Sequence, residues 1–367
     1  MEAHTAQSNY NETAKRVLVA MSGGVDSSVA AYLLKAEGYD VAGVTLRMFG
    51  RELLTESARE AYGETDIVSD AREAADRLSI PHHALDFGEA FRASVVDPFV
   101  RTYCDGGTPN PCIECNRCLK FGKLLDAADE LGYPLLATGH YSKIETVDGR
   151  RVLRLAKDPK KDQTYMLWSL SQEQLARVRF PLGGKNKDEV REIAASLGFT
   201  SATKKDSQDI CFIPDGDYAA FIEQYLGTTF PEGDYLDRDG NVLGKHRGII
   251  HYTVGQRKGL GIALGEPMYV ARKDVLHNTV TLVRNEELFG KTLEVERANL
   301  MLWERLDRPV RVKAKVRYHH IPEWATVTQI SDDRLHVEFD SPVRAIAKGQ
   351  SFVMYVDDLL AGGGIIC

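Results

Sequence analysis

The sequence predicts an α/β protein, in which a parallel-sheet nucleotide-binding domain is followed by a small mixed central domain and a C-terminal all-β domain like a barrel. Three observations lead to this prediction. Apolar, strand-like runs alternate with amphipathic helical stretches up to about residue 200, which is the pattern of βαβ units and a parallel sheet. A glycine-rich loop joins the first strand to the first helix. From Lys291 onward, short strands follow one another without a convincing helix, as in a small barrel or sandwich.

The individual elements follow from apolar runs and helix-ending signals. The run Arg16–Ala20 is apolar after a basic start, and Gly38 ends the helix that follows the glycine-rich loop. We expect strands over Arg16–Ala20, Val41–Leu46, after Ile80 and over Leu135–Thr138, and helices over Asp26–Glu37 and Asp70–Leu78. Turn signals such as Gly259–Gly261 become frequent beyond residue 200. We therefore place the domains at 1–214, 215–287 and 288–367.

Composition narrows the class of protein. The 367 residues are 43% apolar and 27% charged, which is typical of a globular protein with more than one domain. No apolar run is long enough to span a bilayer, and the polar stretch Met1–Asn11 lacks the apolar core of a secretory signal. These features predict a cytoplasmic protein whose cysteines stay reduced unless they are catalytic or bind metal.

The net charge of −7 does not indicate nucleic-acid binding, but a local basic surface can bind nucleic acid on its own. Four cations alternate with apolar residues between Arg311 and Arg317, so a strand there would carry all four on one face. Taken alone, this pattern favours the solvated face of a half-buried strand.

The stretch Ser22–Ser28 carries the strongest chemical signal. Its glycines bring backbone N–H groups to an anion, and the following helix adds the partial positive charge of its N-terminus. Ser27 and Ser28 could add hydroxyl donors, and Asp26 could help to hold magnesium. The lysine of a Walker A loop is missing, which favours a site that grips pyrophosphate and leaves the α-phosphate open to attack. The alternative is a plain helix capped by Asp26 or Ser27.

Six cysteines are present, and three of them, Cys112, Cys115 and Cys118, form a C-x-x-C-x-x-C run after a Pro-Asn-Pro turn. Cys211 lies far along the chain. Such a run has three interpretations: a metal or iron–sulfur site, a sulfur-handling site, or structural thiols. The zinc signal is incomplete, because no second C-x-x-C or paired histidine lies at the usual distance. The structural interpretation is favoured for Cys104 and Cys367.

Several motifs together resemble a known family. Ser22–Ser28 resembles the signature of the PP-loop ATP pyrophosphatases, whose members form adenylates and release pyrophosphate. With it come five more motifs in the same order, and together they cover essentially the whole chain: Thr108–Cys112 with Cys115 and Asn116, Ala137–Tyr141, Lys161–Tyr165, Asp206–Phe212 and Thr253–Leu260. The chain thereby resembles the bacterial tRNA-specific 2-thiouridylases.

The resemblance implies a role for individual residues. Cys115 would be the nucleophile and Cys211 the thiol that takes up sulfur as a persulfide, and the two would join as a disulfide during turnover. ATP would contact Ala20, Met21, Ser22, Gly23, Gly24, Val25, Asp26, Ser27, Leu46 and Gly139. The tRNA would contact Asn110, Pro111, Cys112, His140, Lys161, Asp162, Gln163, Arg317, Tyr318 and Gln350. No residue is assigned as a metal ligand.

The resemblance also implies the reaction and its partners. The enzyme would adenylate the 2-oxygen of the wobble uridine of tRNA, transfer sulfur from the persulfide, and release AMP and pyrophosphate, with ATP and Mg²⁺ as cofactors. Its partners would be the tRNAs for lysine, glutamate and glutamine and a persulfide donor such as a cysteine desulfurase or a sulfur-relay protein, with no membrane. The alternative is an iron–sulfur-dependent thiolase that uses the C-x-x-C-x-x-C cysteines. A PP-loop ligase without a cysteine pair and a non-catalytic RNA-binding scaffold are the other rivals.

Three positions depart from the family pattern. Cys112 stands where some relatives carry an aspartate considered as a base or a ligand, so that role is in doubt here. Gly107 replaces a frequent arginine, which would remove one basic contact. Cys118 is not part of the pattern.

Overall fold

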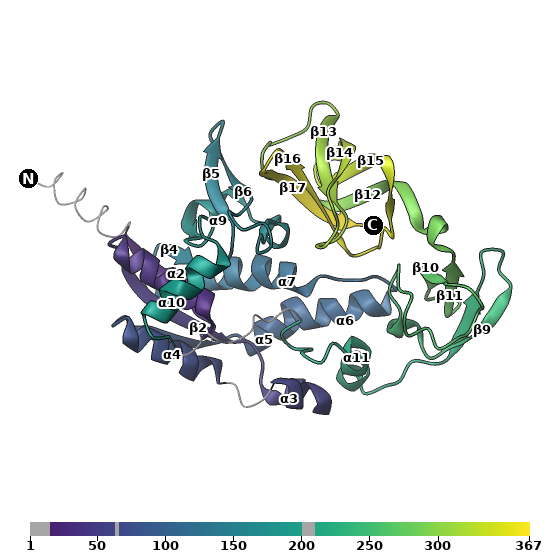
Figure 1. Ribbon diagram of the computed structural model, residues 1–367, viewed down its shortest axis with the longest axis horizontal. Coiled ribbons are helices and arrows are strands. Elements are labelled where there is room, and N and C mark those ends of the chain that lie inside the picture. Colours follow the sequence, from purple (N-terminus) through teal and green to yellow (C-terminus); the bar gives the residue numbers. More distant parts are fainter. Residues whose placement is uncertain (1–14, 63–65, 200–209) are drawn as a thin grey trace, which may run out of the picture.

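The computed structural model describes residues 15–62, 66–199 and 210–367. Three sheets follow one another along the chain: a parallel sheet, a small mixed sheet and a C-terminal sheet that closes into a barrel (Figure 1). This arrangement confirms the predicted fold class. Within these ranges no helix is both long and apolar enough to cross a membrane.

The first sheet has the strand order β3-β2-β1-β4-β7, and every pairing is parallel. Its strands are β1 (Arg16–Ala20), β2 (Asp40–Arg47), β3 (His82–Asp86), β4 (Leu135–Ala137) and β7 (Val178–Arg179). The chain order reverses beside β1, between β2 and β4. In open parallel sheets, ligands bind beyond the carboxyl ends of the strands at such a point.

Helices cover both faces of this sheet, as the continuous apolar run of β1 predicts. Val17 and Val19 point to one face and pack against α2 (Val25–Ala36), α4 (Ile67–Arg77) and α10 (Lys187–Ser196). Leu18 points to the other face and packs with Leu124 and Leu125. The strands that we expected for this sheet are confirmed to within two residues.

A long helical segment that the sequence pattern did not predict crosses the molecule beside the sheet. It consists of α7 (Pro111–Glu114), the π-helix η3 (Cys115–Lys123) and α8 (Leu124–Glu130). Before it stand α5 (Gly88–Phe91), a second π-helix η2 (Arg92–Val96) and α6 (Asp97–Cys104). The shorter elements are η1 (Arg51–Leu53), α3 (Glu56–Tyr62), η4 (Thr164–Leu167) and α9 (Gln172–Arg177).

The central sheet is mixed and small, with the order β10-β11-β8-β9, in which only β11 and β8 run parallel. It contains β8 (Gly233–Leu236), β9 (Val242–His246), β10 (Tyr269–Asp274) and β11 (Thr279–Val283), preceded by α11 (Tyr218–Leu226) and interrupted by η6 (Ile249–His251). Its core is shared with the first domain, because Phe99, Phe212 and Phe221 form one aromatic cluster.

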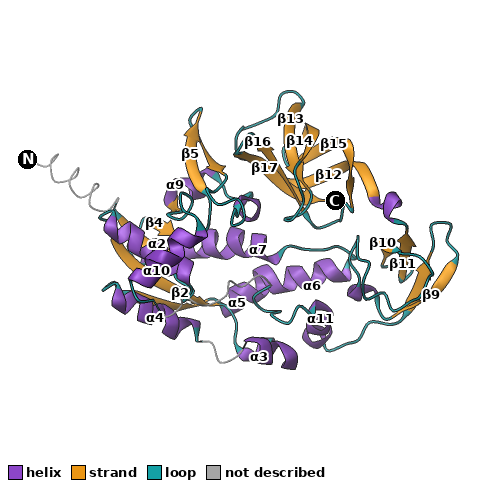
Figure 2. Cartoon of the chain, in the orientation of Figure 1, coloured by secondary structure: helices purple, strands orange, loops and turns teal. Residues whose placement is uncertain are grey.

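The C-terminal barrel has six strands, and β12 closes it by pairing with both β15 and β17. After η7 (Asn285–Leu288) come β12 (Phe289–Leu300), β13 (Val310–Lys315), β14 (Glu323–Ser331), β15 (Arg334–Arg344), β16 (Ser351–Val356) and β17 (Leu359–Ile366). Figure 2 shows the strands of this region in orange without an intervening helix, as we predicted.

A hairpin from the first domain extends the barrel sheet. The hairpin is formed by β5 (Lys143–Val147) and β6 (Arg150–Arg154), and β6 pairs with β17 through Leu153 and Leu360. The N-terminal and C-terminal parts of the chain therefore share one hydrogen-bonded sheet. No pattern in the sequence indicates this connection.

Candidate active site

The phosphate loop, Ser22–Ser28, is tightly enclosed, and at two points of close contact only a glycine fits: Gly23 in the loop and Gly139 beside it. Gly23 has a φ of +71°, and a Cβ atom there would lie 2.5 Å from the Cβ of Asp70 in α4. A Cβ on Gly139, after β4, would lie 2.9 Å from the backbone nitrogen of Ser27. The loop is thus held between α4 and the end of β4, so its backbone shape is set before any ligand arrives.

The two serine hydroxyls of the loop bind the loop itself. Ser27 Oγ donates to the carbonyl of Gly24 at 3.1 Å and accepts from the N–H of Ser22 at 3.2 Å. Ser28 Oγ donates to the same carbonyl at 3.0 Å, and both side chains are buried. In this structure these hydroxyls shape the loop, and their contact with ATP stays a prediction. No side chain caps α2, whose N-cap is Gly24, so the alternative of a helix capped by Asp26 or Ser27 is wrong.

Asp26 is held by two residues far along the chain. Lys187 Nζ lies 2.8 and 2.9 Å from the carboxylate oxygens, and Tyr141 donates its hydroxyl at 2.8 Å. The Lys187 side chain is 6% exposed and that of Asp26 is 32% exposed. A lysine thus stands at the phosphate loop after all, supplied by α10. Sequence reasoning missed it because nothing in its spacing links it to the loop.

The same contacts bear on magnesium. The carboxylate that we proposed as a ligand already serves Lys187 and Tyr141. Over the described ranges, no group of three histidine, cysteine, aspartate or glutamate side chains is arranged to hold a metal ion. Magnesium as a cofactor and the iron–sulfur alternative both stay predictions.

Cys112 and Cys115 lie at the start of the long helical segment, because Asn110 and Pro111 begin a helix there. Asn110 Oδ1 accepts from the N–H of Cys112 at 3.2 Å, and Pro111 occupies the first helical position, where its missing N–H costs nothing. Cys112 is exposed, whereas Cys115 is 7% exposed and its Sγ lies 3.9 Å from the sulfur of Met48, just after β2. The helix thus carries Cys115 to the carboxyl edge of the parallel sheet.

Cys211 joins these two thiols from a distant part of the chain. The next residue, Phe212, is buried, and its ring packs edge-on against Phe91 and Phe99 at 5.5 and 5.4 Å. Cys211 itself is exposed, but protein atoms surround it closely. Burial raises its pKa to about 12, and the nearby Cys115 and Cys112 contribute to the rise.

The three thiols form one electrostatic cluster. Burial also raises the pKa of Cys112 and of Cys115, and the charge of Lys120 acts in the opposite direction on both. All six cysteines are free thiols, so Cys115 and Cys211 are not joined in this state. Their disulfide during turnover stays a prediction. The first part of the Asp206–Phe212 motif lies outside the described residues, which resume at Ile210.

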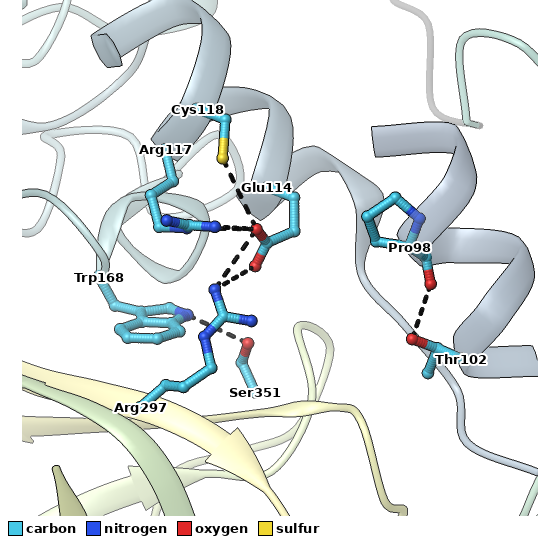
Figure 3. A network of polar contacts seen from close by, with 8 residues as sticks. All are labelled: Pro98, Thr102, Glu114, Arg117, Cys118, Trp168, Arg297 and Ser351. Carbon is cyan, nitrogen blue, oxygen red and sulfur yellow. Dashed lines mark hydrogen bonds and ion pairs between the residues drawn. The ribbon is translucent and has the colours of Figure 1, made fainter. Parts of the chain in front are cut away.

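The carboxylate beside Cys115 connects the helical segment of α7 and η3 to the barrel (Figure 3). The carboxylate of Glu114 accepts hydrogen bonds from Nη2 of Arg117 at 2.6 Å and from Nη2 of Arg297 at 3.1 Å. The thiol sulfur of Cys118 lies 3.9 Å from Oε2 of Glu114. Arg297 has a φ of +53° and lies where the pairing of β12 with β17 shifts register. The irregular backbone lets a barrel residue reach the helix of Cys115.

The predicted tRNA-binding residues of the first domain have structural partners. The carboxylate of Asp162 accepts from the N–H of Ala156 at 2.8 Å and from the hydroxyl of Thr164 at 2.6 Å. Gln163 Oε1 accepts from the N–H of Tyr141 at 3.0 Å. These contacts fix the backbone around Lys161, which is half-buried.

His140 is buried, as is Pro111, whereas the other tRNA-binding candidates are half-buried or exposed. Its Nδ1 lies 2.7 Å from Thr138 Oγ1, and its ring lies between Phe121 and Phe180 at 5.7 and 5.9 Å. Burial, together with the charge of Lys120, lowers its pKa well below the ordinary value, so the ring is neutral. Contact with RNA would have to occur from inside a base pocket.

The barrel brings its candidate residues to the same region. Gln350 Nε2 donates to the carbonyl of Thr108 at 2.9 Å, just before the Pro-Asn-Pro turn that precedes Cys112. The hydroxyl of Tyr318 donates to the carbonyl of Asp162 at 3.0 Å. The predicted alternation is confirmed within β13, where Arg311 and Lys313 are exposed whereas Val312 and Ala314 are buried. The strand ends at the half-buried Lys315, however, so Arg317 lies beyond it and not on its face. Two sets of candidates from distant parts of the sequence thus adjoin each other.

Three family models match the chain consecutively. Residues 15–215 match the tRNA methyl transferase HUP domain, residues 219–284 the tRNA methyl transferase PRC-barrel domain, and residues 290–366 the aminomethyltransferase beta-barrel domain.

Individual relatives match over nearly their whole length. The tRNA-specific 2-thiouridylase MnmA 2 of Clostridium botulinum is 46% identical over 350 residues, 95% of this chain and 98% of its own. The tRNA-specific 2-thiouridylase MnmA of Clostridium perfringens is 47% identical over 354 residues, 96% of this chain and 99% of its own. Among solved structures, a 4-thiouridine synthetase–RNA complex with bound ATP is a remote match, with 20% identity, a TM-score of 0.35, and coverage of 56% of this chain and 46% of that one.

Proposed function

Because this chain belongs to the tRNA-specific 2-thiouridylase family and is a tRNA sulfurtransferase, we propose that it replaces the 2-oxygen of the wobble uridine with sulfur. The observation that carries the proposal is the gathering of Cys112, Cys115 and Cys211 in one cluster. A methyl transferase, which the descriptions of two family models name, needs neither a thiol pair nor a phosphate loop.

The first step is adenylation of the uracil 2-oxygen by ATP. The phosphate loop would hold the pyrophosphate portion through backbone N–H groups and the uncapped start of α2. Lys187 would bring the cation that the loop sequence lacks, because its ammonium already lies at Asp26. Magnesium would arrive with ATP. Asp26 already binds Lys187 and Tyr141, so its part in the reaction is to hold these two side chains at the loop.

The second step transfers the outer sulfur of the Cys211 persulfide to C2 of the uracil. The terminal sulfur of a Cys211 persulfide attacks C2 of the adenylated uracil. The Cys115 thiolate then attacks the Cys211 sulfur, forming the Cys115–Cys211 disulfide and breaking the persulfide bond, whose electron pair stays on the sulfur at C2. AMP leaves with the former 2-oxygen, and an external dithiol returns the disulfide to two thiols.

The tRNA would lie across the first domain and the barrel. Arg317 and Tyr318 of the barrel, together with Lys161 of the first domain, would contact the RNA backbone. The uridine would leave the anticodon stack and enter at Asn110–Cys112, beneath Gln350. We expect the tRNAs for lysine, glutamate and glutamine as substrates, a cytoplasmic encounter, and a persulfide-carrying protein as the sulfur source.

The test combines the protein with ATP, a persulfide donor and tRNA, followed by nuclease digestion and mass spectrometry for 2-thiouridine. We expect 2-thiouridine together with AMP and pyrophosphate. Cys115→Ser and Cys211→Ser should each be nearly inactive, and only Cys211→Ser should fail to take up labelled sulfur. Cys367→Ser, which removes an exposed thiol just after β17, is the matched control.

Two results would overturn the proposal. Stoichiometric ADP in place of AMP would refute adenylation. Full activity in Cys211→Ser, combined with iron in the anaerobically purified protein and loss of activity in Cys118→Ser, would replace the persulfide by an iron–sulfur mechanism.

A further inference from the structure

The raised pKa values of the three thiols make thiolate formation difficult. A thiolate is the nucleophile in sulfur chemistry, and the protein around Cys112, Cys115 and Cys211 raises the pKa of all three. Their mutual repulsion raises the pKa of Cys115 and Cys211 further. The thiols are therefore protonated near neutral pH even with the charge of Lys120 acting on them, and any cation beside them lowers the cost of forming the anion.

We propose that Lys120 supplies this charge, and that its ammonium stabilises anionic sulfur at the transfer centre, as a thiolate on Cys115 and as a persulfide on Cys211. This inference rests on the proposed function. Lys120 would not touch the uracil. Its effect on the reaction would come only from the stabilisation of negative charge on the sulfurs. Sequence reasoning did not single it out.

The π-helix supplies the geometric reason. Cys115 is the first residue of η3 and Lys120 is the sixth. In a π-helix, residue i+5 bonds back to residue i and lies one turn along on the same side. In an α-helix, residue i+5 would be rotated by about 140° from residue i. The π-helical winding therefore turns Lys120 toward the side of Cys115.

The surroundings of Lys120 point the same way. It is half-buried, and its charge acts on Cys112 and Cys115 of its own segment, on Cys211 and on His140. In the part of the chain that the structure describes, no other cation acts on all four groups. Since His140 is buried and neutral, the positive charge of this region resides on the lysine.

The other cations of the helix are used differently. Arg117 is held by Glu114 at 2.6 Å, together with Arg297, and these two guanidinium groups act on Cys118. Lys123, at the end of η3, is exposed. Lys123 is therefore a matched control, since it shares the helix and the charge of Lys120 but not its surroundings.

The experiment measures alkylation of each cysteine by iodoacetamide between pH 6 and 10, with peptide mass spectrometry and without ATP or tRNA. Lys120→Met should displace the alkylation profiles of Cys115 and Cys211 to higher pH. For every pH unit of that displacement, the rate at a fixed pH falls about tenfold, because the thiolate fraction falls in proportion. Lys120→Arg should retain the wild-type profile within about twofold, because the charge is kept. Lys123→Met should leave both profiles unchanged.

Unchanged profiles in a folded Lys120→Met protein would overturn the inference, as would an equal displacement in Lys123→Met. If Lys120→Met does not fold, Lys120→Gln, which is polar and uncharged, decides by the same comparison. Alkylation does not depend on tRNA chemistry. Failure of the wild type to form 2-thiouridine would therefore refute the proposed function, while the alkylation profiles would still test Lys120.

Discussion

Removing the carboxylate of the Asp26–Lys187 pair should cost more stability than removing both charges. Lys187 is 5% exposed, so Asp26→Asn would leave a buried ammonium without its carboxylate, at a cost of about 3 kcal/mol in the free energy of unfolding. In Lys187→Met, the carboxylate keeps the Tyr141 hydroxyl, and with its side chain 32% exposed it can be hydrated, so we expect a loss of about 1.5 kcal/mol. The double variant should lose about 2 kcal/mol, less than the single losses together.

Urea unfolding followed by tryptophan fluorescence measures these losses, and AMP formation is measured in parallel. The sequence assigns Asp26 a role only in binding ATP and magnesium. The structure predicts that its removal weakens both the fold and adenylation. If the two single losses simply add in the double variant, the pair makes no coupled contribution and the reasoning fails.

Three further predictions concern the barrel and the central sheet. Arg297→Ala should change stability by no more than about 1 kcal/mol, because its side chain is 48% exposed, yet lower kcat several-fold with the Kd for tRNA unchanged; a lost tRNA affinity would contradict this. Arg317→Ala should weaken tRNA binding and reduce the salt slope by about one, whereas Arg311→Ala, whose guanidinium is paired with Asp340, should change the slope less; equal slopes in Arg317→Ala and wild type would make this surface a solvated face. Burial lowers the pKa of Lys273 to about 8, below its unfolded value, so the folded state binds fewer protons between the two values. Wild-type stability should therefore rise relative to Lys273→Met from pH 8 to 10 in urea unfolding, and a constant difference would refute the lowered pKa.

The sequence was most informative where one short pattern determines one local structure. The apolar run of β1 and the glycines of the phosphate loop predicted a strand and a turn, because burial and backbone freedom act within a few residues. The alternation from Arg311 onward likewise predicted which residues of β13 are buried.

What the sequence could not predict depends on contacts between distant residues or on an unusual winding. Lys187 reaches Asp26 across 161 positions, and Arg297 reaches Glu114 across 183. The π-helix that begins at Cys115 follows neither the helical nor the strand period, so no search for those periods finds it. The family resemblance paired Cys115 with Cys211. Only the fold shows that Phe212, the residue after Cys211, is buried and so holds Cys211 in place.

The pairing of β6 with β17 has a consequence for the choice of substrate. A barrel that shared only a linker with the first domain could swing to meet RNAs of different shape. Here backbone hydrogen bonds fix the separation between the thiols and the barrel residues that we propose to contact RNA. The strain of fitting must then fall on the RNA, so an anticodon arm would be selected by how easily it bends and releases one base as well as by its sequence.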